Sequence, residues 1–307
     1  MKKVLCILLA SVLLISFVGC NASKDYNDAP TTNGLEEKYN LAVIKLKDED
    51  YSTAKKLFFE CGDYMDSVDY FKKIKALPTV ERIHEDDTDT IIKTKYDNYG
   101  NSIRTEYDYY DGSYVTYDRK YDENNNKIEE KYESLFAYNG EAHKVNTLTQ
   151  YTYNEKNLCV KEVTISSSTS GTQKYYEYDE NGRKIKEIEI NSNGEDITEY
   201  INNEYGDCIQ EICNWANGNS KTYETTYEYD EKGRVIMSHR LYGDEYEYVY
   251  NIYDELISET WTTASGKYKY KYDYDNSGIC IKKTIISPNN EIDTIEYSDF
   301  QYYYYGN

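Results

Sequence analysis

Rows of tyrosine are the part of this chain with the clearest capacity for chemistry. The sequence has 39 tyrosines against 6 phenylalanines and 2 tryptophans. Between Tyr268 and Tyr274 the tyrosines occupy every second position, which places their rings on one face of an extended strand. An aromatic ring with a polar tip suits contact with sugar rings or with the key residues of a partner protein. The rows therefore indicate non-covalent binding.

The same alternation occurs one unit earlier, and a tryptophan lies on the segment between the two rows. The candidate ligand-binding residues are Tyr246, Tyr248, Tyr250, Trp261, Tyr268, Tyr270 and Tyr272. Two interpretations stay open, and both can hold at once. The rings form a cross-strand ladder that stabilises a thin sheet, or they form an aromatic platform for a glycan or a partner protein.

Residue patterns for enzymatic chemistry are missing from the sequence. It contains no H-E-x-x-H motif, no G-x-S-x-G motif and no glycine-rich phosphate loop. The three histidines, His84, His143 and His239, are scattered along the chain. We therefore expect no catalytic residue, no cofactor and no enzymatic activity. An enzyme with an unrecognised site is the remaining alternative.

The run from Asp273 to Gly278 resembles the opening of an EF-hand calcium loop. Its twelfth position is Thr284, where such a loop needs a bidentate Glu. The run from Glu177 to Gly182 shares the spacing, so the pattern is not special to one place. We predict that these are turn residues and that the chain has no metal site.

These rows belong to a pattern that occurs eight times between residues 96 and 282. Each copy has an anchor residue, then Asp or Asn, then Gly, Asn or Asp at the fourth position after the anchor, and Ile or Val at the seventh. The anchors are Tyr96, Tyr121, Tyr153, Tyr178, Asn202, Tyr229, Tyr250 and Tyr274. Asp and Asn initiate turns, and Gly, Asn and Asp tolerate the positive φ that short hairpin loops require. The pattern therefore predicts one β-hairpin per unit.

The most regular copies are the runs from Tyr176 to Arg183 (YEYDENGR) and from Tyr227 to Arg234 (YEYDEKGR). They resemble the bacterial Rhs/YD-repeat family over roughly residues 94–307, although six of the eight copies lack the Arg after the Gly. Long members of that family curl their hairpins into a shell that can enclose a toxin. We expect a mainly β fold, a curled antiparallel sheet of about eight YD-type hairpin repeats, with a small N-terminal α-helical module. Eight units are too few to close such a shell, and the sequence leaves undecided whether the sheet is open or closed.

Residues 1–19 have the pattern of a lipoprotein signal peptide. Lys2 and Lys3 precede an apolar run that is too short to span a membrane. The run ends in F-V-G-C, which resembles the lipobox of bacterial lipoproteins and places the modified residue at Cys20. The resemblance implies cleavage before Cys20 and an anchor of two acyl chains on its sulfur, which is enough for stable attachment. We expect a lipid-anchored protein on the outer face of the cell membrane.

Behind the signal, residues 20–34 are polar and predict a tether. Residues 35–77 switch to helical periodicity, and the spacing of Tyr51, Ala54 and Phe58 resembles the second half of a tetratricopeptide unit. The pattern favours a third helix that runs to Ala76. Residues 78–93 are expected to be a linker, and residues 94–307 the repeat domain.

The net charge limits the classes of partner that this chain can bind. The formal net charge is −21, and it becomes more negative once Lys2 and Lys3 are removed. Nucleic acid is excluded as a partner because phosphate binding needs clustered Lys and Arg. The sequence thus predicts a cell-surface lipoprotein that acts as a non-enzymatic repeat scaffold. Its expected partners are the lipid bilayer, through Cys20, and a cell-wall glycan or a surface protein. The alternative is an accessory or immunity lipoprotein of an Rhs-type toxin system.

Overall fold

The computed structural model describes residues 32–85, 88–138, 141–241 and 243–306. The predicted signal peptide, Cys20 and nearly all of the predicted tether lie outside these described residues. Within them, no helix combines the length and the apolar character needed to cross a membrane.

The N-terminal part of the described chain is helical. Its helices are α1 (Thr32–Lys47), α2 (Tyr51–Cys61) and α3 (Ser67–Lys73). Asp50 caps α2 because its side chain accepts a hydrogen bond from the backbone N–H of Thr53 at 3.3 Å. Ala54 and Phe58 are fully buried, as the helical pattern indicates.

The expectation that the third helix runs to Ala76 is wrong, since Ile74 already opens a strand. The remaining described chain forms 18 strands joined by turns. They are β1 (Ile74–Glu85), β2 (Thr88–Tyr96), β3 (Ser102–Asp108), β4 (Tyr114–Tyr121), β5 (Lys127–Tyr138), β6 (Glu141–Tyr153), β7 (Cys159–Ser166), β8 (Thr172–Tyr178), β9 (Lys184–Asn191), β10 (Gly194–Asn202), β11 (Cys208–Asn214), β12 (Ser220–Tyr229), β13 (Val235–Arg240), β14 (Glu245–Tyr250), β15 (Leu256–Thr263), β16 (Gly266–Tyr274), β17 (Cys280–Ile286) and β18 (Ile292–Tyr304).

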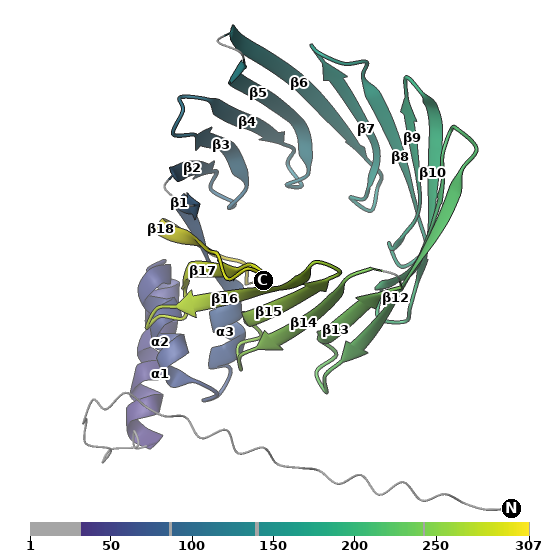
Figure 1. Cartoon of the computed structure of the whole chain (residues 1–307). Coiled ribbons are helices and arrows are strands. Elements are labelled where there is room, and N and C mark those ends of the chain that lie inside the picture. Colours follow the sequence, from purple (N-terminus) through teal and green to yellow (C-terminus); the bar gives the residue numbers. More distant parts are fainter. Residues whose placement is uncertain (1–31, 86–87, 139–140, 242, 307) are drawn as a thin grey trace, which may run out of the picture.

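The sheet is closed. Each strand pairs antiparallel with the next one along the chain, and β1 pairs with both β18 and β2. Figure 1 shows the strands following one another around a ring, with β1 between β18 and β2. The expected curled sheet of about eight hairpin repeats is therefore wrong, because the sheet closes on itself through β1, which lies outside the repeats. The structure is an antiparallel barrel of 18 described strands that carries three described helices at one side.

The strand that closes the ring comes from the predicted linker. Residues 78–93 form most of β1 and β2 instead of a connection without regular structure. Val80 and Ile83 of β1 pair with Lys93 and Thr90 of β2. Pro78 sits in the part of β1 that pairs with β18 and not with β2, where its missing N–H is tolerated. The β-branched residues of this segment favour a strand more strongly than the proline and the acidic residues disfavour it.

The prediction of one hairpin per repeat is confirmed at the turns. The fourth residue after each anchor has positive φ, between 59° and 97°, whether it is Gly, Asn or Asp. In the copy that begins at Tyr178, Asp179 accepts the backbone N–H groups of Asn181 and Arg183, both at 2.9 Å. The Asx side chain thus holds the turn closed from inside.

The anchor side chains join successive hairpins. Tyr178 donates its hydroxyl to the carbonyl oxygen of Cys159 at 2.7 Å, and Tyr274 donates to that of Leu256 at 2.8 Å. In each case the acceptor is the first residue of the return strand in the preceding unit. In the unit whose anchor is Asn202, the side-chain amide takes the place of the phenol and donates to the carbonyl oxygen of Lys184 at 3.0 Å. The repeated tyrosine is therefore a cross-link between neighbouring units.

The main apolar core lies where the helices meet the barrel. Because the strands alternate in direction, all eight repeat turns lie at the same rim, and the helices pack there beside β18 and β1 (Figure 1). Phe58, Phe71 and Ile74 are buried against Tyr253, which comes from the turn between β14 and β15. Tyr253 also donates its hydroxyl to the carbonyl oxygen of Phe59 at 2.7 Å. The helices and the sheet therefore share one core.

Candidate functional site

The predicted ligand-binding residues form one continuous aromatic patch on a single face of β14, β15 and β16. Its central row crosses three strands, because Tyr246 lies opposite Trp261 and Trp261 lies opposite Tyr268. The Tyr246 and Trp261 rings are 6.0 Å apart between centroids and nearly parallel, at 2°. Trp261 and Tyr268 are 5.0 Å apart at 24°. We call this row, together with Tyr248, Tyr250, Tyr270 and Tyr272, the aromatic patch.

A carboxylate lies inside the aromatic patch. Glu259 is the cross-strand partner of both Tyr248 and Tyr270, and its Oε2 accepts the hydroxyl of Tyr272 at 3.4 Å. Glu259 is a functional candidate that the sequence did not single out, because acidic residues are abundant throughout the chain. Its signal is its position two residues before Trp261 on the same face of β15. The patch therefore combines ring surfaces with a strong hydrogen-bond acceptor.

Burial favours the protonated form of four hydroxyls of the aromatic patch. It raises the pKa of Tyr246, Tyr248 and Tyr270 above the ordinary tyrosine value, and the nearby Glu259 carboxylate adds to this effect at each ring. Burial followed by Glu259 also raises the pKa of Tyr272. These four phenols therefore remain neutral hydrogen-bond donors at physiological pH.

Tyr250 has a structural task at the edge of the patch. Its hydroxyl donates to the carbonyl oxygen of Val235 at 3.0 Å, and the guanidinium of Arg234 lies 4.7 Å from its ring centroid. On the other side, the Lys283 amine lies 4.6 Å from the ring centroid of Tyr270. Tyr250 therefore joins neighbouring hairpins, as the structural interpretation expects, while the interpretation of the rings as a binding platform stays a prediction.

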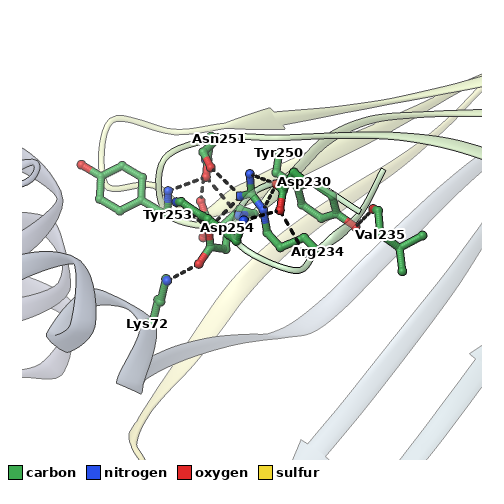
Figure 2. A network of polar contacts seen from close by, with 10 residues as sticks. Lys72, Asp230, Arg234, Val235, Tyr250, Asn251, Tyr253 and Asp254 are labelled. Carbon is green, nitrogen blue, oxygen red and sulfur yellow. Dashed lines mark hydrogen bonds and ion pairs between the residues drawn. The ribbon is translucent and has the colours of Figure 1, made fainter. Parts of the chain in front are cut away.

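Beside the aromatic patch, ion pairs connect the helices to the sheet. Figure 2 shows Lys72 of α3 in contact with Asp254, from the turn that follows β14. Asp254 also pairs with Arg234 at 2.7 Å, and Arg234 pairs with Asp230. Hydrogen bonding from Lys72 lowers the pKa of Asp254 to about 2. This network fixes the repeat turn that separates the two strands carrying Tyr248 and Glu259.

The run from Asp273 to Gly278, which resembles the opening of a calcium loop, forms a repeat turn, as predicted. Asp275 accepts the backbone N–H groups of Ser277 at 2.7 Å and Ile279 at 3.0 Å, as the Asx residues of the other repeat turns do. Within the described ranges, no group of three or more His, Cys, Asp or Glu side chains is arranged to hold a metal ion. The carboxylate of Asp275 is occupied by the turn itself.

Comparisons with known proteins give weak structural similarities. A porin-like protein from Bacteroides uniformis is 11% identical, with 73% of this chain and 96% of that chain covered and a TM-score of 0.42. A porin-like protein from Bacteroides vulgatus is 12% identical, with 73% and 98% covered and a TM-score of 0.30. The TcdB2-TccC3-Cdc42 structure is 15% identical, with 70% of this chain and 12% of that chain covered and a TM-score of 0.32.

None of these similarities transfers a function, since identity and TM-score are both low. No protein-family model matches the chain, and no curated protein matches it. Membership of the Rhs/YD-repeat family therefore stays a prediction from the repeat motifs, with only weak structural similarity to a TccC3-containing complex beside it. The geometry of the aromatic patch is therefore the basis for the function proposed below.

Proposed function

We propose that this chain is a non-enzymatic, lipid-anchored surface scaffold whose aromatic patch binds a neutral glycan. The observation that carries the proposal is the row of Tyr246, Trp261 and Tyr268, with Glu259 directly beside it. Aromatic rings offer apolar surface to the C–H groups of a sugar, and phenols and a carboxylate offer donors and acceptors to its hydroxyls. The anchor rests on the sequence around Cys20.

Charge favours a neutral ligand over a polyanion. The chain has a formal net charge of −21, which repels acidic polysaccharides and nucleic acid at moderate salt. A basic partner protein would bind through charge, and its affinity would fall steeply with added salt. Ring contact with a neutral glycan predicts little salt dependence. The accessory or immunity role in a toxin system rests on the sequence resemblance alone.

The patch is tested by replacing Tyr248 and Tyr270 together with serine. These two residues flank Glu259 on adjacent strands, so their loss removes two ring surfaces while leaving the turns intact. We expect binding to isolated, uncharged cell-wall glycan to weaken roughly tenfold or more, since each aromatic contact contributes about 0.5–1.5 kcal/mol. Co-sedimentation of the full chain in detergent with the glycan, at low and high salt, measures the effect.

Tyr110→Ser is the matched control, because Tyr110 is exposed in the turn between β3 and β4, many strands away from the aromatic patch. It should bind like the wild type. The proposal fails if the double variant retains full binding, or if binding by the wild type disappears in moderate salt. Thermal melts separate the remaining case: a double variant that binds poorly and melts much earlier shows that the rings are structural.

The anchor is tested by Cys20→Ala. Without the thiol no thioether can form, so the variant should leave the membrane fraction and appear in the medium, while wild type stays with the membrane. Cell fractionation followed by immunoblotting measures the distribution. Equal release of the two proteins would contradict the anchor and leave the aromatic patch proposal untouched.

A further inference from the structure

A cavity of about 560 Å³ lies between the helices and the barrel rim. Its aromatic lining includes Phe71 of α3, Tyr253 of the turn between β14 and β15, and Tyr274, Tyr297 and Phe300 of the sheet. Tyr272 lines the cavity too, so the cavity adjoins the aromatic patch without being part of it. Its volume falls within the range of small-ligand pockets, and its walls are mostly apolar.

Charged groups of both signs face this cavity from separate elements. Glu255 comes from the turn between β14 and β15, Lys55 from α2 and Lys75 from the start of β1. Lys72 and Asp254 also line it, but they pair with each other. Asp275, close by, is engaged by backbone N–H groups of its own turn. Glu255 and Lys75 are therefore the charges that a ligand can meet.

Lys55 is already satisfied by the protein. Its amine donates to the carbonyl oxygens of Phe71 at 3.2 Å and Ile74 at 2.9 Å, and it lies 3.5 Å from the centroid of the Phe71 ring. Burial lowers the pKa of Lys55 to about 8. Because these contacts already engage its amine, Lys55 is not the cation that we assign to the ligand.

Glu255 faces the cavity with its carboxylate only partly engaged. Asn251 donates to its Oε2 at 3.1 Å. Burial raises its pKa, while Lys55 and Lys75 act in the opposite direction. Among the described ion pairs, none joins Glu255 directly to either lysine. Groups of opposite charge thus line one largely apolar cavity, which suits a ligand that carries both charges and an apolar body.

We propose that this cavity binds a small zwitterion with an apolar body, such as a hydrophobic α-amino acid, with its ammonium group at Glu255 and its carboxylate at Lys75. The aromatic walls accept the apolar body and also favour an ammonium group near the rings. A ligand with both charges leaves no cavity charge without a partner, whereas a ligand with one charge does. The cavity shares Tyr272 with the aromatic patch, but Glu255 and Lys75, which would hold the two charges, lie outside the patch.

The proposal is tested by isothermal titration calorimetry of the full chain in detergent with three probes. L-phenylalanine has both charges, 3-phenylpropionate lacks the ammonium group, and phenethylamine lacks the carboxylate. We expect saturable binding of L-phenylalanine and binding roughly tenfold or more weaker for each analogue, the usual scale for losing a hydrogen bond to a charged group. No saturable binding of L-phenylalanine, or equal binding of all three probes, would overturn the proposal.

Two variants test which residue of the cavity binds the ammonium group of the ligand and which binds its carboxylate. Glu255→Gln keeps the acceptor for Asn251 and should weaken L-phenylalanine and phenethylamine roughly tenfold while leaving 3-phenylpropionate unchanged. Lys75→Gln should weaken L-phenylalanine and 3-phenylpropionate and spare phenethylamine. Lys271→Gln, on the exposed face of β16, is the control and should change nothing. If Glu255→Gln folds normally and has no more effect than Lys271→Gln, the assignment is wrong.

Discussion

Replacing Gly278 with alanine should cost about 3 kcal/mol of unfolding free energy, whereas the same change at Gly233 should cost only about 1–2 kcal/mol. Both glycines occupy the same position of the repeat turn and have positive φ, +68° and +76°. Around Gly233 no atom lies within 4 Å of an added Cβ. At Gly278 the added Cβ would lie 2.5 Å from Phe59 and 2.7 Å from Phe71. The difference therefore measures how tightly the helices pack on the barrel rim.

Urea unfolding followed by circular dichroism gives both free energies. Limited proteolysis adds a structural readout, because a displaced helical module should be cut first in Gly278→Ala and not in Gly233→Ala. Equal costs for the two substitutions would show that the helices do not rest on this turn.

Raising the pH should unfold the barrel between about pH 10 and 12. Burial raises the pKa of many tyrosines, to about 12 for Tyr153 and Tyr297. In the unfolded chain tyrosine ionises near pH 10. Because the folded pKa is the higher one, this stabilisation is fully present below pH 10 and is lost as the pH rises through the folded values. A tyrosinate also cannot donate a hydrogen bond, so links such as that from Tyr153 to the Lys127 carbonyl, at 2.8 Å, would break.

Tyrosinate absorbance at 295 nm and far-ultraviolet circular dichroism, recorded in one titration, test this expectation. Ionisation of most tyrosines should coincide with loss of the sheet signal and lie above the curve of the urea-unfolded chain. Ionisation near pH 10 with an intact sheet signal would mean that the hydroxyls do not hold the hairpins together.

The repeat turns could be predicted from the sequence because their signal is local. Asp179 and Gly182 specify a turn through an Asx contact and a positive φ, and neither depends on distant residues. The common face of the aromatic patch follows in the same way from alternation along a strand. The partners of the anchor hydroxyls lie in the preceding unit, so only the paired sheet reveals them.

Closure of the barrel could not be predicted because it depends on a strand outside the repeat. β1 has no copy of the pattern, and its proline at Pro78 and the acidic residues near Asp86 are typical of a linker. The role of β1 in closing the barrel follows from its pairing with β18, the last described strand of the chain. Glu259 and Glu255 were missed for another reason: only the fold distinguishes them from the many other acidic residues.

Fluorescence of Trp261 tests the proposed glycan site most directly. Trp215→Phe removes the other tryptophan, which is exposed near the end of β11, and leaves Trp261 as the sole reporter inside the aromatic patch. Titration with a neutral N-acetylglucosamine hexamer should then produce a saturable change in emission that high salt preserves. Adding Tyr248→Ser and Tyr270→Ser should move the midpoint of the titration to a roughly tenfold or more higher hexamer concentration without lowering the melting temperature much. An emission spectrum that does not respond to the hexamer, or a midpoint that is unchanged by loss of both tyrosines, would contradict the proposed site.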